Sequence, residues 1–190
     1  MIFQGLNLPD DKKILECELL VTQCQRGDRD AFGRIVAMWE QPLFYYLRRL
    51  APSEADTWDL LQETWFKIFR ALPSLRDARS LPAFLYTTAR NTAISRLRLR
   101  ANETSNGQLP EPSSQDYAFV AFDDADQVHH ALDQLSLPQR EAVTLYFLED
   151  LSIDEIAQVL GVAVGTVKSR LHYAKQAIRK IISNGDRHGN

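Results

Sequence analysis

The sequence predicts an all-α fold of two small helical domains joined by a flexible linker, with a helix-turn-helix as the C-terminal domain. Apolar residues recur at spacings of three and four along most of the chain, and no convincing strand alternation is present. The length of 190 residues allows one domain or two small ones. Hydrophobic residues make up 45% and charged residues 25%, a composition that supports packed cores and excludes wholesale disorder.

The first half of the N-terminal domain has a helical pattern that a proline interrupts. Apolar residues recur through Leu15–Val21 and again from Phe32 to Trp39. Because Pro42 lacks a backbone N–H, we expect it to break or kink the second helix. Leu43–Leu50 is then predicted to form a separate short helix.

Two longer helices follow. Ser53 is placed to cap an amphipathic helix over Glu54–Leu72, which ends before Pro73. Pro82 stands in the first turn of the next helix, which is expected to run to about Ala101. The first hundred residues therefore predict a domain of four or five helices.

Composition sets the domain boundaries. Residues Asn102–Asp116 are polar, with Gly and Pro and with Leu109 as the one large apolar residue, which is typical of a linker. An aromatic cluster over 117–122 either packs back onto a domain or docks on a partner. The predicted parts are an N-terminal tail (1–14), a helical domain (15–101), an acidic linker (102–124), a helix-turn-helix domain (125–184) and a C-terminal tail (185–190).

The net charge of −3 averages over parts of different sign. Residues 1–100 carry 15 Lys and Arg against 12 Asp and Glu, residues 101–135 carry none against seven, and residues 136–190 carry seven against six. The overall charge therefore says little about binding to nucleic acid.

Several classes of protein are not expected. No run of 18 apolar residues could span a membrane, and Met1–Asp11 lacks the pattern of a signal peptide, so we expect a cytoplasmic protein without membrane insertion. Cys17 and Cys24 would lie about 10 Å apart on one helix, too far for a disulfide, and are expected to be core residues rather than zinc or redox groups. Without a phosphate-binding glycine loop or a His/Cys/Asp set at metal spacing, we expect no enzyme, metal or cofactor.

The most informative stretch is Ser152–Ala174. Ser152 and Glu155 form a capping box, and Gly161 stands where a left-handed residue would end the helix. Ala157 is small where two helices must cross closely. This combination is the pattern of a helix-turn-helix, whose second helix would enter the major groove of DNA.

The second helix of this motif separates an apolar face from a basic one. Its apolar stripe runs from Val167 to Ile181 at spacings of three and four. From Val162 onward six Lys and Arg stand against one Asp, a local charge of +5 that suits phosphate contacts. The alternative is a helical hairpin with a solvated basic face. The candidate DNA contacts are Lys168, Ser169, Arg170, His172 and Tyr173.

A second basic stretch lies in the first domain, from Arg76 to Arg100, with six basic residues against one acidic. Phe84 and Tyr86 are interleaved with the charges, which suits a nucleic-acid strand, although such residues are also typical of a core. Asn91 is harder to explain as core, because its amide can donate to and accept from a base edge.

The helix before it is acidic and aromatic. Four acids fill its first half, which also suits the helix dipole, and Trp58, Leu61, Trp65 and Phe69 form a stripe beside them. A surface of this kind could dock a basic helical partner.

Three of these segments resemble motifs of bacterial sigma factors. Asp59–Trp65 resembles region 2.2, and Phe84–Ile94 resembles regions 2.3 and 2.4. Leu135–Ile182 resembles region 4, and Gly165–Leu171 is close to the usual sequence of that region. The order of the motifs, the short linker and the lack of other regions resemble the extracytoplasmic-function (ECF) type over residues 15–183.

The resemblance implies a promoter-specificity subunit that acts by binding. In that family region 2.2 binds the β′ clamp of core RNA polymerase, regions 2.3 and 2.4 recognise and open the minus-ten element by capturing a non-template base, and region 4 contacts the minus-thirty-five element. The residues at those positions are Asp59, Leu61, Gln62 and Glu63 for the clamp; Tyr86, Arg90, Asn91 and Arg96 for the minus-ten element; and Lys168, Ser169, Arg170, His172 and Tyr173 for the minus-thirty-five element.

Further partners are implied in the same way: the β flap of the polymerase, promoter DNA and an anti-sigma factor, with a monomeric free chain and a linker that follows the polymerase channels. The sequence departs from the family pattern at Phe84, Ser95, Ala163 and Tyr173, and Ala163 cannot cap a helix as Ser does. The alternative is a free-standing helix-turn-helix regulator whose first domain senses a ligand or dimerises.

Overall fold

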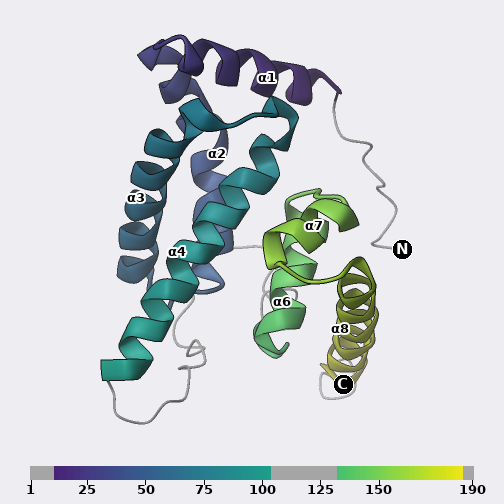
Figure 1. Cartoon of the computed structure of the whole chain (residues 1–190). Helices are drawn as coiled ribbons and strands as arrows, with labels where there is room; N and C mark the ends of the chain where they lie inside the picture. The colour runs from purple at the N-terminus through teal and green to yellow at the C-terminus, as the bar shows by residue number, and fades with distance from the viewer. Residues whose placement is uncertain (1–10, 104–131, 186–190) are drawn as a thin grey trace.

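The computed structural model describes residues 11–103 and 132–185, and over these ranges the chain is helical with no strand. Most of the predicted linker, with its aromatic cluster, and the first residues of the predicted second domain lie outside the described ranges. Figure 1 shows a first set of helices within residues 11–103 and a second set within residues 132–185, with the second set beside α4. The helices are α1 (Asp11–Gln25), α2 (Arg29–Arg48), α3 (Glu54–Ala71), α4 (Leu81–Glu103), α6 (Leu137–Val143), α7 (Ile153–Leu160) and α8 (Val164–Gly185).

Of the predicted break or kink at Pro42, the break is wrong, and so is the separate helix over Leu43–Leu50, because α2 continues through Pro42 as one helix of 20 residues. The proline removes one backbone hydrogen bond. A single apolar face, however, runs from Ile35 across the proline to Leu47 and is buried along its whole length. Burial of this face outweighs the lost bond, since tertiary packing supplies most helix stability in proteins.

The predicted boundaries of the next two helices are close to those observed. The Ser53 hydroxyl accepts from the Asp56 amide at 3.1 Å and caps α3, which ends at Ala71, two residues before Pro73. Helix α4 begins at Leu81, with Pro82 in its first turn, and extends to Glu103. Two short 3₁₀ turns, Leu72–Ser74 and Ala78–Ser80, join α3 to α4.

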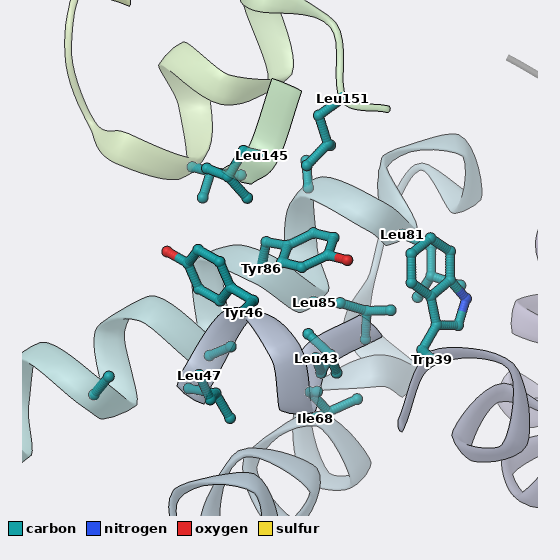
Figure 2. Packing of buried hydrophobic residues seen from close by; sticks show 14 of the residues in the cluster. Trp39, Leu43, Tyr46, Leu47, Ile68, Leu81, Leu85, Tyr86, Leu145 and Leu151 are labelled. Atoms are coloured by element: carbon teal, nitrogen blue, oxygen red, sulfur yellow. The ribbon is translucent and has the colours of Figure 1, made fainter. Parts of the chain in front are cut away.

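The first set of helices packs around α2, which lies against α1, α3 and α4. Figure 2 shows Leu43, Ile68 and Leu85 beneath the rings of Tyr46 and Tyr86. These two rings meet edge to face with centroids 5.3 Å apart, a favoured aromatic geometry. The buried tyrosines therefore place α2 and α4 in a defined register.

The second set folds as the motif predicts. The Ser152 hydroxyl accepts from the Glu155 amide, and the Glu155 carboxylate accepts from the Ser152 amide at 2.8 Å, which completes the capping box. Gly161 ends α7 in the left-handed conformation, with φ of 64°. Helix α8 packs against α6 and α7 through buried Val167 and Ala174. Between α6 and α7 the chain widens into a π-helical turn, Thr144–Leu148.

The two sets share one buried core. Leu145, Leu151 and Ile156 belong to the same cluster as Leu43 and Tyr86. Figure 2 shows Leu145 and Leu151 pointing toward the rings of Tyr46 and Tyr86, and Figure 1 shows α7 beside α4. The second set is thus packed against the face of α4 that carries Tyr86.

Candidate nucleic-acid and polymerase interfaces

Helix α8 presents a polar, mostly exposed face opposite its buried stripe. Lys168, Ser169 and His172 are exposed, Arg170 is half-buried, and the Tyr173 ring is 59% exposed. The Ser169 hydroxyl donates to the Thr166 carbonyl at 2.9 Å, so its oxygen keeps acceptor capacity toward a base or phosphate. Four of the five predicted residues are exposed and Arg170 is partly exposed, and all five lie outside the buried stripe of Val167 and Ala174; we call these five residues the α8 face.

The predicted minus-ten residues on α4 are divided between two environments. Asn91 is exposed and Arg96 half-buried, with its guanidinium 3.7 Å from the Glu63 carboxylate of α3. Tyr86 is fully buried, and its hydroxyl donates to the Glu149 carboxylate. Arg90 donates through Nε to the Glu141 carboxylate at 2.8 Å. Tyr86 and Arg90 therefore face the second set of helices, whereas Asn91 and Arg96 reach solvent.

The two buried tyrosines are held in their neutral form. Burial, followed by the nearby Glu149 carboxylate, raises the pKa of Tyr86 well above its usual value. Burial, followed by Glu141, does the same to the pKa of Tyr46, although the Arg90 guanidinium opposes the shift. Both hydroxyls therefore act as donors at neutral pH.

The outer face of α3 is acidic and aromatic. Asp59 and Gln62 are exposed, and Glu63 is half-buried and pairs with Lys67 at 2.8 Å. Leu61, predicted to contact polymerase, is only 2% exposed and belongs to the core. Its buried position follows from the helical period, since Leu60, Leu61, Thr64 and Ile68 form the inward stripe of α3.

Sequence reasoning missed one member of this surface. Phe66 is 61% exposed, and the Arg70 guanidinium lies 5.6 Å from its ring centroid. The signal is present in the spacing, because Trp58, Gln62 and Phe66 recur every fourth residue on the side opposite the core. We call Trp58, Asp59, Gln62, Glu63, Phe66 and Phe69 the α3 face.

Among residues 11–103 and 132–185, no group of three or more His, Cys, Asp or Glu is arranged to hold a metal ion. Cys17 is buried and Cys24 half-buried, and neither of these two cysteines is in a disulfide. Burial raises the pKa of the Cys24 thiol. None of the helices in these ranges is both long enough and apolar enough to cross a membrane.

Two family models match the chain in sequence. The model of sigma-70 region 2 matches residues 35–103, and that of sigma-70 region 4 matches residues 125–178. The chain is 31% identical to the ECF RNA polymerase sigma-E factors of Escherichia coli K12 and Salmonella typhimurium, over 85% of this chain and 91% of theirs. It is 29% identical to the RNA polymerase sigma-H factor of Pseudomonas aeruginosa, over 86% of this chain and 92% of that protein.

Solved structures show the same likeness. The sigma factor RpoE of Bartonella quintana, crystallised with the anti-sigma factor NepR, is 28% identical, with a TM-score of 0.68 over 80% of this chain and 96% of that one. CnrH, in complex with the cytosolic domain of CnrY, shares the fold, with a TM-score of 0.67 over 89% of this chain and 98% of that one, at 23% identity. The sequence matches cover both helical sets, whereas a match to a helix-turn-helix alone would cover only the second set. The chain therefore belongs to the ECF type of the sigma-70 family, the promoter-specificity subunits of RNA polymerase.

Proposed function

We propose that this sigma subunit binds its partners through three separate surfaces, and that the α8 face contacts the minus-thirty-five element. The main support is that α8 follows a capped α7 that ends at a glycine, and that four polar residues of α8 are exposed: Lys168, Ser169, His172 and Tyr173. This is the arrangement in which a recognition helix offers its N-terminal part to the major groove. Lys168 and Arg170 would bind phosphates, and His172 and Tyr173 would reach base edges.

Helix α4 would contact the minus-ten element. Asn91 would bind a base extruded from the non-template strand, and Arg96 and Arg90 would bind the flanking phosphates. Unstacking a base costs a few kcal/mol, which stacking on an aromatic ring and hydrogen bonds must offset. Tyr86 could supply that ring only after the second set of helices moves away from α4, because its ring is fully buried here.

The α3 face would bind the β′ clamp of core polymerase. It joins exposed aromatic rings to the carboxylates of Asp59 and Glu63, which suits a basic helical partner. Leu61 would support this surface from the core rather than touch the polymerase. The second set of helices would contact the β flap.

The chain would act by binding alone, in the cytoplasm, as a monomer when free. An anti-sigma factor is proposed as a further partner, since the Bartonella quintana relative was crystallised with one. A free-standing regulator is not favoured, because both sigma regions match in order along the chain.

Site-specific photocrosslinking in reconstituted holoenzyme tests the three assignments. A photoreactive residue at position 91 is expected to label the non-template minus-ten strand, at 173 the minus-thirty-five duplex, and at 62 the β′ subunit. Arg29, exposed at the start of α2 and outside all three surfaces, is the control position. Labelling of β′ from 173, or of DNA from 62, would overturn the assignment of that surface.

A further inference from the structure

We propose that Lys67 of α3 is a further phosphate-binding residue of the minus-ten site. Two side chains, Thr92 of α4 and Glu63 of α3, hold its ammonium at the turn of α4 that carries Asn91. The inference rests on the proposed role of α4 in capturing a base of the non-template strand. The ligand of Lys67 would be a phosphate of that strand, so α3 and α4 would bind the strand together.

The Lys67 ammonium is fixed between the two helices. Its Nζ donates to the Thr92 hydroxyl at 3.1 Å and lies 2.8 Å from Oε1 of Glu63, one turn earlier on α3. An ammonium has three N–H donors, and these contacts occupy two of them. The Lys67 side chain is 44% exposed, so the third donor can reach a ligand from solvent. Because the long side chain is already restricted, binding a phosphate would cost it less conformational entropy.

The Thr92 hydroxyl connects Lys67 to the turn that carries Asn91. Thr92 is only 1% exposed, and its hydroxyl donates to the Thr88 carbonyl at 2.9 Å. With its hydrogen donated in this way, the Thr92 oxygen serves Lys67 as an acceptor. This back-bonding also holds the Thr92 side chain in one rotamer. Asn91, the preceding residue, is exposed, so the ammonium is bound to the residue next to the proposed base contact.

The charges at this contact between α3 and α4 favour an anion. The Glu63 carboxylate lies between two cations, because Oε1 contacts Lys67 while Oε2 is 3.7 Å from Nη2 of Arg96. The three side chains carry two positive charges and one negative charge, and each is 41–44% exposed. Arg96 follows Thr92 by one turn of α4, a rise of about 6 Å along the helix axis. A strand that runs along α4 would therefore meet Lys67 and Arg96 in succession.

The alternative is that Lys67 only joins α3 to α4. Exposed ionic contacts contribute little to stability, and Ile68, the next residue, already anchors α3 in the core. The two roles also differ in what they predict for DNA. A lysine that only supports the fold would affect every phosphate contact alike, whereas a phosphate ligand affects the contact with one phosphate.

Neutral methylphosphonate linkages test the contact one phosphate at a time. The DNA is a promoter fragment at which wild-type holoenzyme starts transcription on genomic DNA, with one non-template minus-ten linkage neutralised in each duplex. Affinity is measured for holoenzyme that carries the wild-type chain, Lys67→Gln or Arg34→Gln. Arg34 is the matched control, because it is an exposed cation that pairs with the Glu16 carboxylate at 3.1 Å and belongs to none of the three proposed surfaces.

Wild-type holoenzyme is expected to lose about 3- to 10-fold in affinity when the linkage that meets Lys67 is neutralised, the range for a charge-assisted bond that stays partly exposed. Lys67→Gln should show no loss at that linkage, whereas Arg34→Gln should lose as much as wild type. Lys67→Arg, which keeps the positive charge, should retain the loss. On unmodified DNA, Lys67→Gln should lower the salt slope by about 0.7–1, with thermal unfolding close to that of wild type.

Lys67→Met, which keeps the apolar stem of the side chain, is a second neutral variant and should behave as Lys67→Gln does. The contact is rejected if no linkage distinguishes wild type from either neutral variant, or if Arg34→Gln removes the same loss. Asn91→Ala is measured on the same fragment to separate this failure from failure of the proposed function. If Asn91→Ala binds and opens the fragment as wild type does, the proposed role of α4 is wrong; if it does not, and Lys67 shows no linkage-specific effect, only the Lys67 contact is wrong.

Discussion

Arg96 of α4 and Glu63 of α3 form an ion pair, with Nη2 and Oε2 3.7 Å apart. The two residues are assigned to different partners, promoter DNA and core polymerase, yet they lie side by side. Both side chains are about two-fifths exposed, and Glu63 also binds Lys67. The proposed polymerase and minus-ten surfaces therefore meet along the α3–α4 contact.

Replacing Arg96 by Ala is expected to weaken DNA binding without unfolding the protein. An exposed pair of this kind contributes about 0–1 kcal/mol, so thermal unfolding should change little. If Arg96 binds a phosphate, the salt slope of promoter binding by holoenzyme should fall by about 1. An unchanged salt slope would mean that Arg96 pairs with Glu63 but does not contact a phosphate.

Neutral substitutions of Lys168 and of Arg170 should each lower the same salt slope by about 1. Both residues lie on the α8 face, and neither contributes to the buried stripe of that helix. Titrations of promoter duplex with holoenzyme at several salt concentrations give the slope. Gln158→Ala, exposed on the preceding helix and uncharged, is the control that should leave it unaltered.

Leu61→Ala and Asp59→Lys should separate folding from polymerase binding on α3. Leu61 is buried, so its truncation is expected to cost about 2–5 kcal/mol of unfolding free energy. Asp59 is exposed, so its charge reversal should leave denaturant unfolding nearly unchanged and weaken co-purification with core polymerase. If Asp59→Lys binds core as wild type does, the α3 face is not the clamp contact.

Gly161→Ala should destabilise the second helical set through backbone conformation alone. The left-handed φ of 64° costs a residue with a Cβ about 1–2 kcal/mol, and a Cβ built there meets no atom within 4 Å. Gly161→Asn should cost less, because Asn tolerates this conformation. Equal losses in urea unfolding for Ala and Asn would contradict the conformational explanation.

Stability should fall above pH 10 because of the two buried tyrosines. Their pKa values are raised in the folded state, so the stabilisation is complete below the unfolded pKa of about 10. As pH rises further, the unfolded chain releases protons first and is favoured, by up to about 1.4 kcal/mol per pH unit for each tyrosine. Tyr46→Phe should reduce this slope by one tyrosine's share, and Tyr45→Phe, at an exposed ring, should not.

The local signals of the sequence predicted the helices well, because caps, glycine and proline act over a few residues. Three predicted local features are observed: the Ser53 cap, the capping box of Ser152 and Glu155, and the left-handed Gly161. The predicted break at Pro42 was wrong because the local preference of proline to end a helix is outweighed by burial of an apolar face that extends on both sides of Pro42. The surroundings of Tyr86 and Arg90 could not be predicted, because they depend on Glu149 and Glu141, more than 50 residues further along the chain.

The most direct test of the account is to sequence the transcripts that core polymerase makes in vitro from genomic DNA, with and without the chain. The account predicts new transcripts with discrete 5′ ends, preceded by one shared pair of upstream elements, that appear only when the chain is added. It would be contradicted if the chain co-purified with core polymerase but left the set of transcripts unchanged, or if it did not bind core at all.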